Sequence, residues 1–320
     1  MLYRMRPLRP HCVCLPARTL GLAFCVLLTT FSAPTVLRAQ DAGTGGGSGC
    51  RSGNCENGTG RYEWPDGERY SGGFQNGRVH GQGTYITING TRIEGQFVAG
   101  YLNGRARIRY PNGSTYEGGV RAGQKSGTGS LRFADGSRYD GAFQNDQPAG
   151  RGTLTRRDGS KRTATFRGGR STGQVQLEFP NGDRYEGPLQ NGLPAGKGVL
   201  RQKSGAVYAG EFRRGKPEGV GRLELPGGDV YEGEFESGIM RGRGKYSHVN
   251  GDIYTGEFQS GQPHGRGVLE FKSGAVYEGE FLKGQKHGRG SFTRASGRKV
   301  FGRFEADVFV ESLDVEAPPS

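Results

Sequence analysis

The sequence predicts an all-β fold: an elongated, single-layer antiparallel β-sheet of about eleven stacked 23-residue β-hairpin repeats, twisted into a trough. Three observations predict it. A Tyr-x-Gly-x-Phe pattern returns every 23 residues without an insertion, as Tyr254 and Tyr277 illustrate. The segment "YEGEF" alternates apolar and acidic side chains, which is the period of a half-buried strand. Asx-Gly pairs recur between alternating runs, and this pair is a strong local signal for a hairpin.

The composition agrees with a repeat array once the period is known. Gly 61 and Pro 15 among 320 residues, with only 32% hydrophobic residues, would indicate disorder in a sequence without a period. Periodic glycines indicate instead a quasi-one-dimensional array in which each unit contacts its neighbours.

Residues 1–39 have the features of a secretory signal peptide. Arginines precede an apolar run at 20–31, and small residues follow it, ending near Ala39. The sequence therefore predicts export to the periplasm, the cell surface or the extracellular space. The alternative is a membrane anchor formed by an uncleaved segment 20–37, although its apolar run is short for a bilayer span.

Residues 40–57 are expected to form a glycine-rich linker and an N-terminal cap. This segment contains Cys50 and Cys55. An isolated pair of cysteines in an exported chain indicates a disulfide, because a zinc site would need further ligands nearby.

Within the array, residues 58–304, each unit reads as a strand, a glycine-rich stretch, a second strand and a turn. The glycine-rich stretch "xxGxxxGxG" is expected to be a loop. Proline precedes Asx-Gly in several turns, as at Pro65, and cannot donate a ladder hydrogen bond. This favours a three-residue loop with glycine in the left-handed position. That register places Leu269 opposite Tyr277 on one face.

The aromatic face is the first candidate binding surface. Its tyrosines and phenylalanines are expected to line the trough. The candidate ladder residues are Tyr208, Tyr231, Tyr254, Tyr277, Phe235, Phe258 and Phe281.

The repeated segments "YEGEFLKGQKHGRG" (277–290) and "YTGEFQSGQPHGRG" (254–267) resemble the MORN (membrane occupation and recognition nexus) repeat. The resemblance covers about residues 58–304. It implies a β-hairpin ribbon that serves scaffolding, dimerisation or membrane apposition, and it does not imply catalysis.

The unit at 162 departs from the pattern. Arg162 replaces the tyrosine, Ala164 replaces the first glycine, and Pro188 interrupts the strand that follows. Beyond the array, residues 305–320 are expected to form an acidic, disordered tail.

The sequence contains no pattern typical of an active site. His80, His264 and His287 share one repeat position, and Glu278 and Glu280 are spaced by the strand pleat. The sequence predicts no enzyme, cofactor or metal site, and no nucleic-acid partner.

Basic residues are concentrated at 151–170, where Asp158 is the single acid. Arg156, Arg157, Lys161 and Arg162 form a candidate patch for an anionic ligand. Two hypotheses follow. The chain is a non-catalytic exported scaffold that binds a protein partner or a second copy of itself. Alternatively, it is a peripheral membrane-surface protein whose patch binds anionic lipid headgroups or acidic glycans.

If the signal segment is cleaved, the mature chain should begin near Gln40, because the small residues that precede it form the cleavage site. Mass spectrometry of the purified protein measures this. Recovery of Met1 or Met5 in soluble protein would contradict cleavage.

Overall fold

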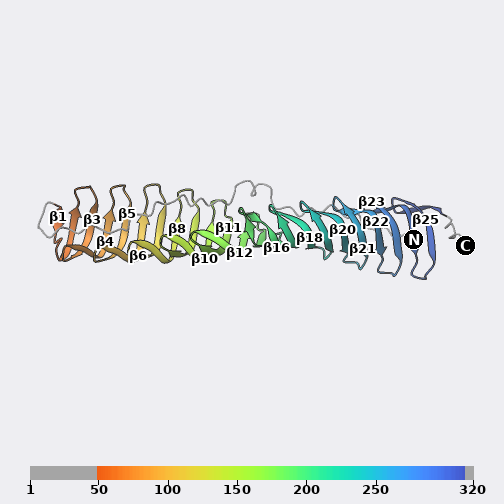
Figure 1. Ribbon diagram of the computed structural model, residues 1–320, viewed down its shortest axis with the longest axis horizontal. Coiled ribbons are helices and arrows are strands. Elements are labelled where there is room, and N and C mark those ends of the chain that lie inside the picture. Colours follow the sequence, from red (N-terminus) through yellow and green to blue (C-terminus); the bar gives the residue numbers. More distant parts are fainter. Residues whose placement is uncertain (1–48, 314–320) are drawn as a thin grey trace. The chain divides into compact units, whose positions relative to one another are not determined.

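The computed structural model describes residues 49–313, and the regular elements in that range are all β-strands (Figure 1). These residues divide into two compact units, the N-terminal unit (49–180) and the C-terminal unit (181–313). The predicted signal segment, linker residues 40–48 and tail residues 314–320 lie outside the described residues. No helix within 49–313 is long and apolar enough to cross a membrane.

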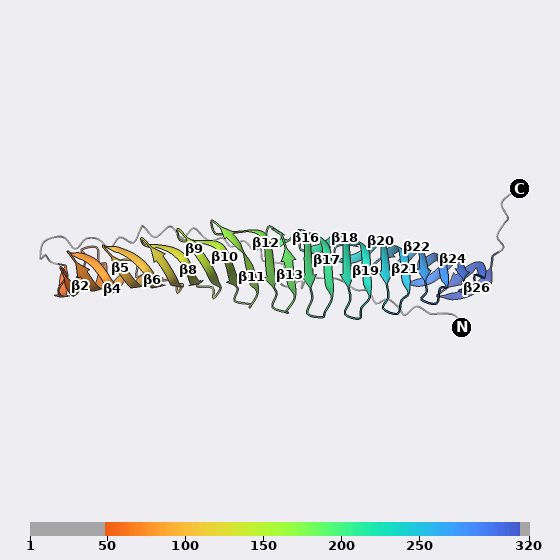
Figure 2. The same cartoon turned by 90° about the horizontal axis from the view of Figure 1, so that it is seen from below.

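Each unit is a single layer of antiparallel strands that lie side by side in chain order (Figure 1, Figure 2). The strands of the N-terminal unit are β1 (Cys50–Gly53), β2 (Gly58–Glu63), β3 (Arg69–Gln75), β4 (Arg78–Ile86), β5 (Arg92–Val98), β6 (Tyr101–Arg109), β7 (Thr115–Arg121), β8 (Gln124–Arg132), β9 (Arg138–Gln144), β10 (Gln147–Thr155), β11 (Lys161–Arg167) and β12 (Arg170–Glu178). Those of the C-terminal unit are β13 (Arg184–Gly187), β14 (Leu189–Gln190), β15 (Leu193–Pro194), β16 (Gly196–Arg201), β17 (Val207–Arg213), β18 (Lys216–Glu224), β19 (Val230–Glu236), β20 (Ile239–Ser247), β21 (Ile253–Gln259), β22 (Gln262–Glu270), β23 (Val276–Leu282), β24 (Gln285–Thr293), β25 (Lys299–Glu305) and β26 (Val308–Ser312). The predicted hairpin-repeat sheet is confirmed.

One end of each repeat has the predicted three-residue loop. The Trp64 N–H donates to the Glu68 carbonyl at 2.9 Å, and the Gly67 N–H donates to the Trp64 carbonyl at 2.9 Å. Gly67 has a φ of 91°, the left-handed conformation that this loop requires. In the same type of turn, Leu269 pairs with Tyr277. The predicted register is therefore confirmed.

The prediction of a loop for the glycine-rich stretch is wrong. After β23, a two-residue turn at Lys283 and Gly284, with φ values of 51° and 81°, leads directly into β24. Two left-handed residues are typical of a type I′ hairpin turn. The extra residues of β24 form a β-bulge at Gly288, where the register with β23 shifts. The bulge bends the strand without ending it, so the stretch remains in the sheet.

Each repeat tyrosine packs against two glycines of its own hairpin. Gly210 on β17 faces Gly221 on β18. A Cβ on Gly210 would lie 2.5 Å from the Tyr208 hydroxyl, and one on Gly221 would lie 2.5 Å from the ring. The hydroxyl donates a hydrogen bond to the Glu211 carbonyl at 2.9 Å. Because both glycines lack side chains, the ring is buried directly against the backbone.

The aromatic rings connect successive repeats. Tyr208 contacts Phe212 of its own repeat at 5.2 Å and Phe235 of the next at 4.9 Å, both edge-to-face. Such contacts stabilise by about 0.5–1.5 kcal/mol beyond the burial itself. The same two contacts recur at Tyr231 and Tyr254. A continuous row of rings therefore crosses these strands and forms the core.

Both ends of the described chain are paired strands. Cys50 and Cys55 form the predicted disulfide, and β1 pairs with β2. The disordered tail expected from residue 305 is wrong for its described part, because β26 pairs with β25. The reason is apolar packing: the ring of Phe309 lies 5.3 Å from that of Phe304.

Two buried ion pairs join neighbouring repeats. Asp307 takes a turn position that glycine usually fills, with a φ of 72°. Its Oδ1 accepts a hydrogen bond from the Lys286 backbone N–H at 3.0 Å and lies 3.4 Å from Lys286 Nζ. Lys125 and Asp146 repeat this arrangement. Both lysines are buried, so each depends on its carboxylate for charge compensation.

Asp307→Gly should lower the free energy of unfolding of the chain by roughly 3 kcal/mol, because it leaves a buried ammonium group without its carboxylate. Adding Lys286→Met should recover most of this loss. The double variant reproduces the arrangement of Met240 and Gly261, where the Gly261 N–H donates to the Met240 carbonyl. Denaturant unfolding of the single and double variants measures the effect. A double variant as unstable as Asp307→Gly would contradict the explanation.

The buried tyrosines should make the fold sensitive to alkali. Burial raises the pKa of Tyr70, Tyr139 and Tyr185 from 10.0 to about 12. The folded state thus retains these protons to higher pH than the unfolded state does. Their contribution to stability is complete below pH 10 and is lost as the pH rises through 12, by about 1.4 kcal/mol per pH unit for each tyrosine.

Tyrosinate absorbance and far-ultraviolet circular dichroism should therefore change together in one alkaline transition. Tyrosinate absorbance that developed fully while the circular dichroism stayed native would contradict this prediction.

Candidate functional site

The predicted ladder residues form the core and present no open surface. Their side chains are 0–4% exposed, and they are Tyr208, Tyr231, Tyr254, Tyr277, Phe235, Phe258 and Phe281. The structure brings them together in one row, as the sequence indicates. Because neighbouring repeats cover the rings, we assign the row to packing and place the candidate binding surface on the opposite face.

The predicted basic patch does not gather on one exposed face. Arg157 is exposed in the turn between β10 and β11, and Lys161 Nζ lies 3.5 Å from Glu178 Oε2. Arg162 is only 9% exposed. Anionic-ligand binding by this patch stays a prediction, and Arg162 is not part of its exposed surface.

Arg162 occupies the position that tyrosine fills in most repeats. It pairs with Leu154 on β10 and with Leu177 on β12. Burial lowers the pKa of its guanidinium, and the positive charge of Arg156 lowers it further. The hairpin of β11 and β12 nevertheless forms, so this repeat keeps its backbone pairing without the tyrosine.

In the C-terminal unit, the face opposite the rings carries an open groove of about 1390 Å³, which we call the charged groove. It crosses β19 to β25. Side chains alternate between the two faces of a strand, so the residues that flank the floor glycines point into it. They include Arg243, Lys245, Arg266, Glu278 and Arg289.

Two glutamates of this face fold back onto bulges in the backbone. Glu234 Oε1 accepts a hydrogen bond from the Arg243 backbone N–H at 3.2 Å, and Glu257 Oε1 accepts one from the Arg266 N–H at 3.4 Å. A Cβ on the bulge residue Gly242 would lie 2.5 Å from Glu234 Oε2. Because Gly242 has no side chain, the Glu234 carboxylate can lie beside it and accept the hydrogen bond from the Arg243 N–H.

The guanidinium groups of Arg243, Arg266 and Arg289 form what we call the arginine row. Each arginine lies between two glycines, on β20, β22 and β24 respectively, and each is exposed. Within residues 49–313, none of the three takes part in an ion pair. The row therefore offers three successive cationic groups to a ligand in the groove.

One end of the charged groove is apolar. Phe301 is 39% exposed and lines the groove together with Leu313. The Leu313 N–H donates to the Phe301 carbonyl at 3.2 Å, which holds the two residues together. Lys299 Nζ lies 4.8 Å from the centre of the Phe301 ring, a cation–π contact.

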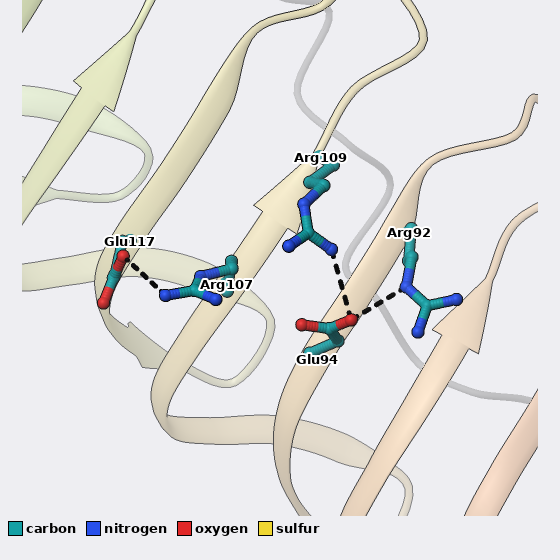
Figure 3. A network of polar contacts seen from close by, with 5 residues as sticks. All are labelled: Arg92, Glu94, Arg107, Arg109 and Glu117. Atoms are coloured by element: carbon teal, nitrogen blue, oxygen red, sulfur yellow. Dashed lines mark hydrogen bonds and ion pairs between the residues drawn. The ribbon is translucent and has the colours of Figure 1, made fainter.

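The N-terminal unit has a smaller groove of about 610 Å³ on the corresponding face. Three arginines beside it are in ion pairs (Figure 3): Arg92 Nε and Arg109 Nη1 lie 2.8 and 3.2 Å from Glu94 Oε1, and Arg107 Nη2 lies 3.2 Å from Glu117 Oε2. The hydrogen bond from Arg92, with the nearby positive charges, lowers the pKa of Glu94. Two carboxylates therefore compensate two of the three positive charges in this network. Arg105, which also lines this groove, takes part in no ion pair among residues 49–313.

The arginine row was missed in the sequence, although a signal for it exists. Gly-Arg-Gly recurs at the 23-residue period around Arg243, Arg266 and Arg289. In the N-terminal unit, Thr128 separates the equivalent Arg105 and Arg151. Three successive occurrences thus distinguish the C-terminal unit.

Among residues 49–313, no group of three or more His, Cys, Asp or Glu side chains is arranged to hold a metal ion. His80, His264 and His287 lie in strands β4, β22 and β24, at the bulges, and not in loops.

A family model described as the MORN repeat matches most of the chain. It matches residues 56–69, 70–92, 94–115, 116–138, 139–161, 185–207, 208–230, 231–253, 254–276 and 277–297. The interval between 161 and 185 is the repeat in which Arg162 replaces tyrosine. The sequence matches none of the curated proteins.

Two solved structures show a limited likeness. The TCP10 domain of Danio rerio CPAP, in complex with a STIL peptide, is 13% identical with a TM-score of 0.39, over 76% of this chain and 98% of that one. The SAS-4 TCP domain of Drosophila melanogaster, in complex with a proline-rich motif of Ana2, is 18% identical with a TM-score of 0.34, over 48% and 85%. With TM-scores below 0.5, neither likeness bears on function.

Proposed function

The chain belongs to the MORN repeat family, and on that premise we propose that it is a non-catalytic scaffold whose charged groove binds a protein partner. The observation that carries the proposal is the contrast between the two faces of the C-terminal unit. The aromatic face is closed by packing between repeats, whereas the opposite face is an open groove with cationic groups in no ion pair.

The chemistry of the groove suits a protein ligand. Its floor combines charges of both signs, such as Arg266 and Glu278, with an apolar end at Phe301. Interfaces between proteins typically combine such polar groups with exposed aromatic anchors. A membrane-surface role is supported by fewer residues, because Arg162 of the proposed patch is buried.

The proposal includes export. The order of residues in the segment 1–39 supports it, and so does the Cys50–Cys55 disulfide, because disulfides persist in oxidising compartments. The partner is accordingly expected outside the cytosol, and sequencing of the mature N-terminus tests this part of the proposal separately.

A photoreactive residue in place of Val268, on the groove floor, should crosslink the mature chain to one protein partner in its native host. The matched control is the same residue in place of Ile88, which is 71% exposed in a turn of the N-terminal unit. Mass spectrometry identifies the products. A product that contains two copies of this chain would identify self-association instead.

Crosslinking of the same proteins at equal yield from both positions would contradict a specific groove. So would an absence of products from Val268, and from a second groove position at Thr255, in cells where the chain is folded.

A further inference from the structure

We propose that the arginine row recognises an acidic segment of the partner that crosses the strands in the polyproline II conformation, with a carboxylate at every third residue. This inference rests on the proposed function and names the chemistry of the partner.

The spacing of the row supplies the first argument. Arg243, Arg266 and Arg289 lie on alternate strands of one antiparallel sheet. Neighbouring strands lie about 4.8 Å apart, so successive arginines are about 9.6 Å apart across the sheet. A ligand that meets all three must present its carboxylates at about this interval.

Polyproline II meets this interval on one face. It has three residues per turn and rises about 3.1 Å per residue, so every third side chain points the same way at about 9.3 Å. In a β-strand, side chains on one face repeat at about 6.7 Å. In an α-helix, side chains seven residues apart point the same way and lie about 10.5 Å apart. This distance exceeds the interval between the arginines, so the mismatch grows along the row.

The charges favour a periodic peptide over a uniform polyanion. Glu234 and Glu257 bind backbone N–H groups, which leaves the guanidinium groups available for bidentate contacts with carboxylates. Glu278, on β23 between the arginines of β22 and β24, also lines the groove. It would repel a polymer charged at every position, but a neutral residue between two acidic ones can face it.

The apolar end of the groove agrees with a proline-rich ligand. Phe301 and Leu313 lie together there. Prolines of polyproline II ligands typically dock on exposed aromatic rings. The proposed ligand is therefore acidic over the arginine row and apolar beside Phe301.

Two synthetic peptides test the inference by fluorescence anisotropy on the full mature chain. One repeats Pro-Pro-Asp, and the other has the same composition with its aspartates adjacent. We expect the repeat peptide to bind about tenfold more tightly, because only its carboxylates match the row. Arg266→Gln should weaken it about tenfold. Arg241→Gln is the matched control, since Arg241 is exposed on β20, pairs with Glu236 and does not line the groove.

Equal affinity for the two peptides, no binding of either, or no effect of Arg266→Gln would overturn the inference, with circular dichroism confirming that the variants fold. Anionic vesicles that displaced the repeat peptide as effectively as unlabelled peptide would also overturn it. If crosslinking from Val268 persists in any of these cases, the proposed function stands and only the chemistry of the partner is wrong. If no crosslinked product forms from Val268, both the proposed function and this inference are wrong.

Discussion

The packing of a tyrosine ring against two facing glycines is the interaction on which most of the repeats depend. Tyr208 can be buried only because neither Gly210 nor Gly221 has a side chain. Its hydroxyl donates a hydrogen bond to the Glu211 carbonyl, so the buried polar group has a partner. A single-layer sheet has no second layer to cover its apolar face. Here the ring is covered by its own backbone and by phenylalanines of its own and the next repeat, so burial is achieved within one layer.

This packing separates the two faces of the C-terminal unit: one face forms the core, and the other carries the groove to which we assign the proposed binding. Because the rings of the row are enclosed, they present no surface to a ligand. The opposite face contributes little to the core and can carry charge. Its glycine bulges take up the carboxylates of Glu234 and Glu257, and the arginines of the same strands remain available. The bulges thus bind the carboxylates to the backbone, and the groove presents the positive charge of the arginines.

The repeat at Arg162 shows which part of the pattern is indispensable. It lacks the tyrosine and both glycines of the pair, which are Ala164 and Val175 here. The family model does not match it, yet β11 and β12 pair as a hairpin. Backbone hydrogen bonds and the burial of Phe166 and Leu177 are sufficient there. The tyrosine–glycine contact therefore stabilises the repeats that have it, whereas the turns and the backbone hydrogen bonds between strands form the hairpin even without it.

The sequence by itself determined the period, the strands, the three-residue loops and the register that sets Leu269 beside Tyr277, because these depend on residues within one repeat. It misassigned the glycine-rich stretch, since a bulge cannot be told from a loop by composition. Only the tertiary structure decided which face is closed. That outcome depends on rings and backbones of neighbouring repeats, as does the pairing of Lys286 with Asp307. Contacts between side chains one repeat apart leave no local pattern in the sequence, whereas turns and alternation do.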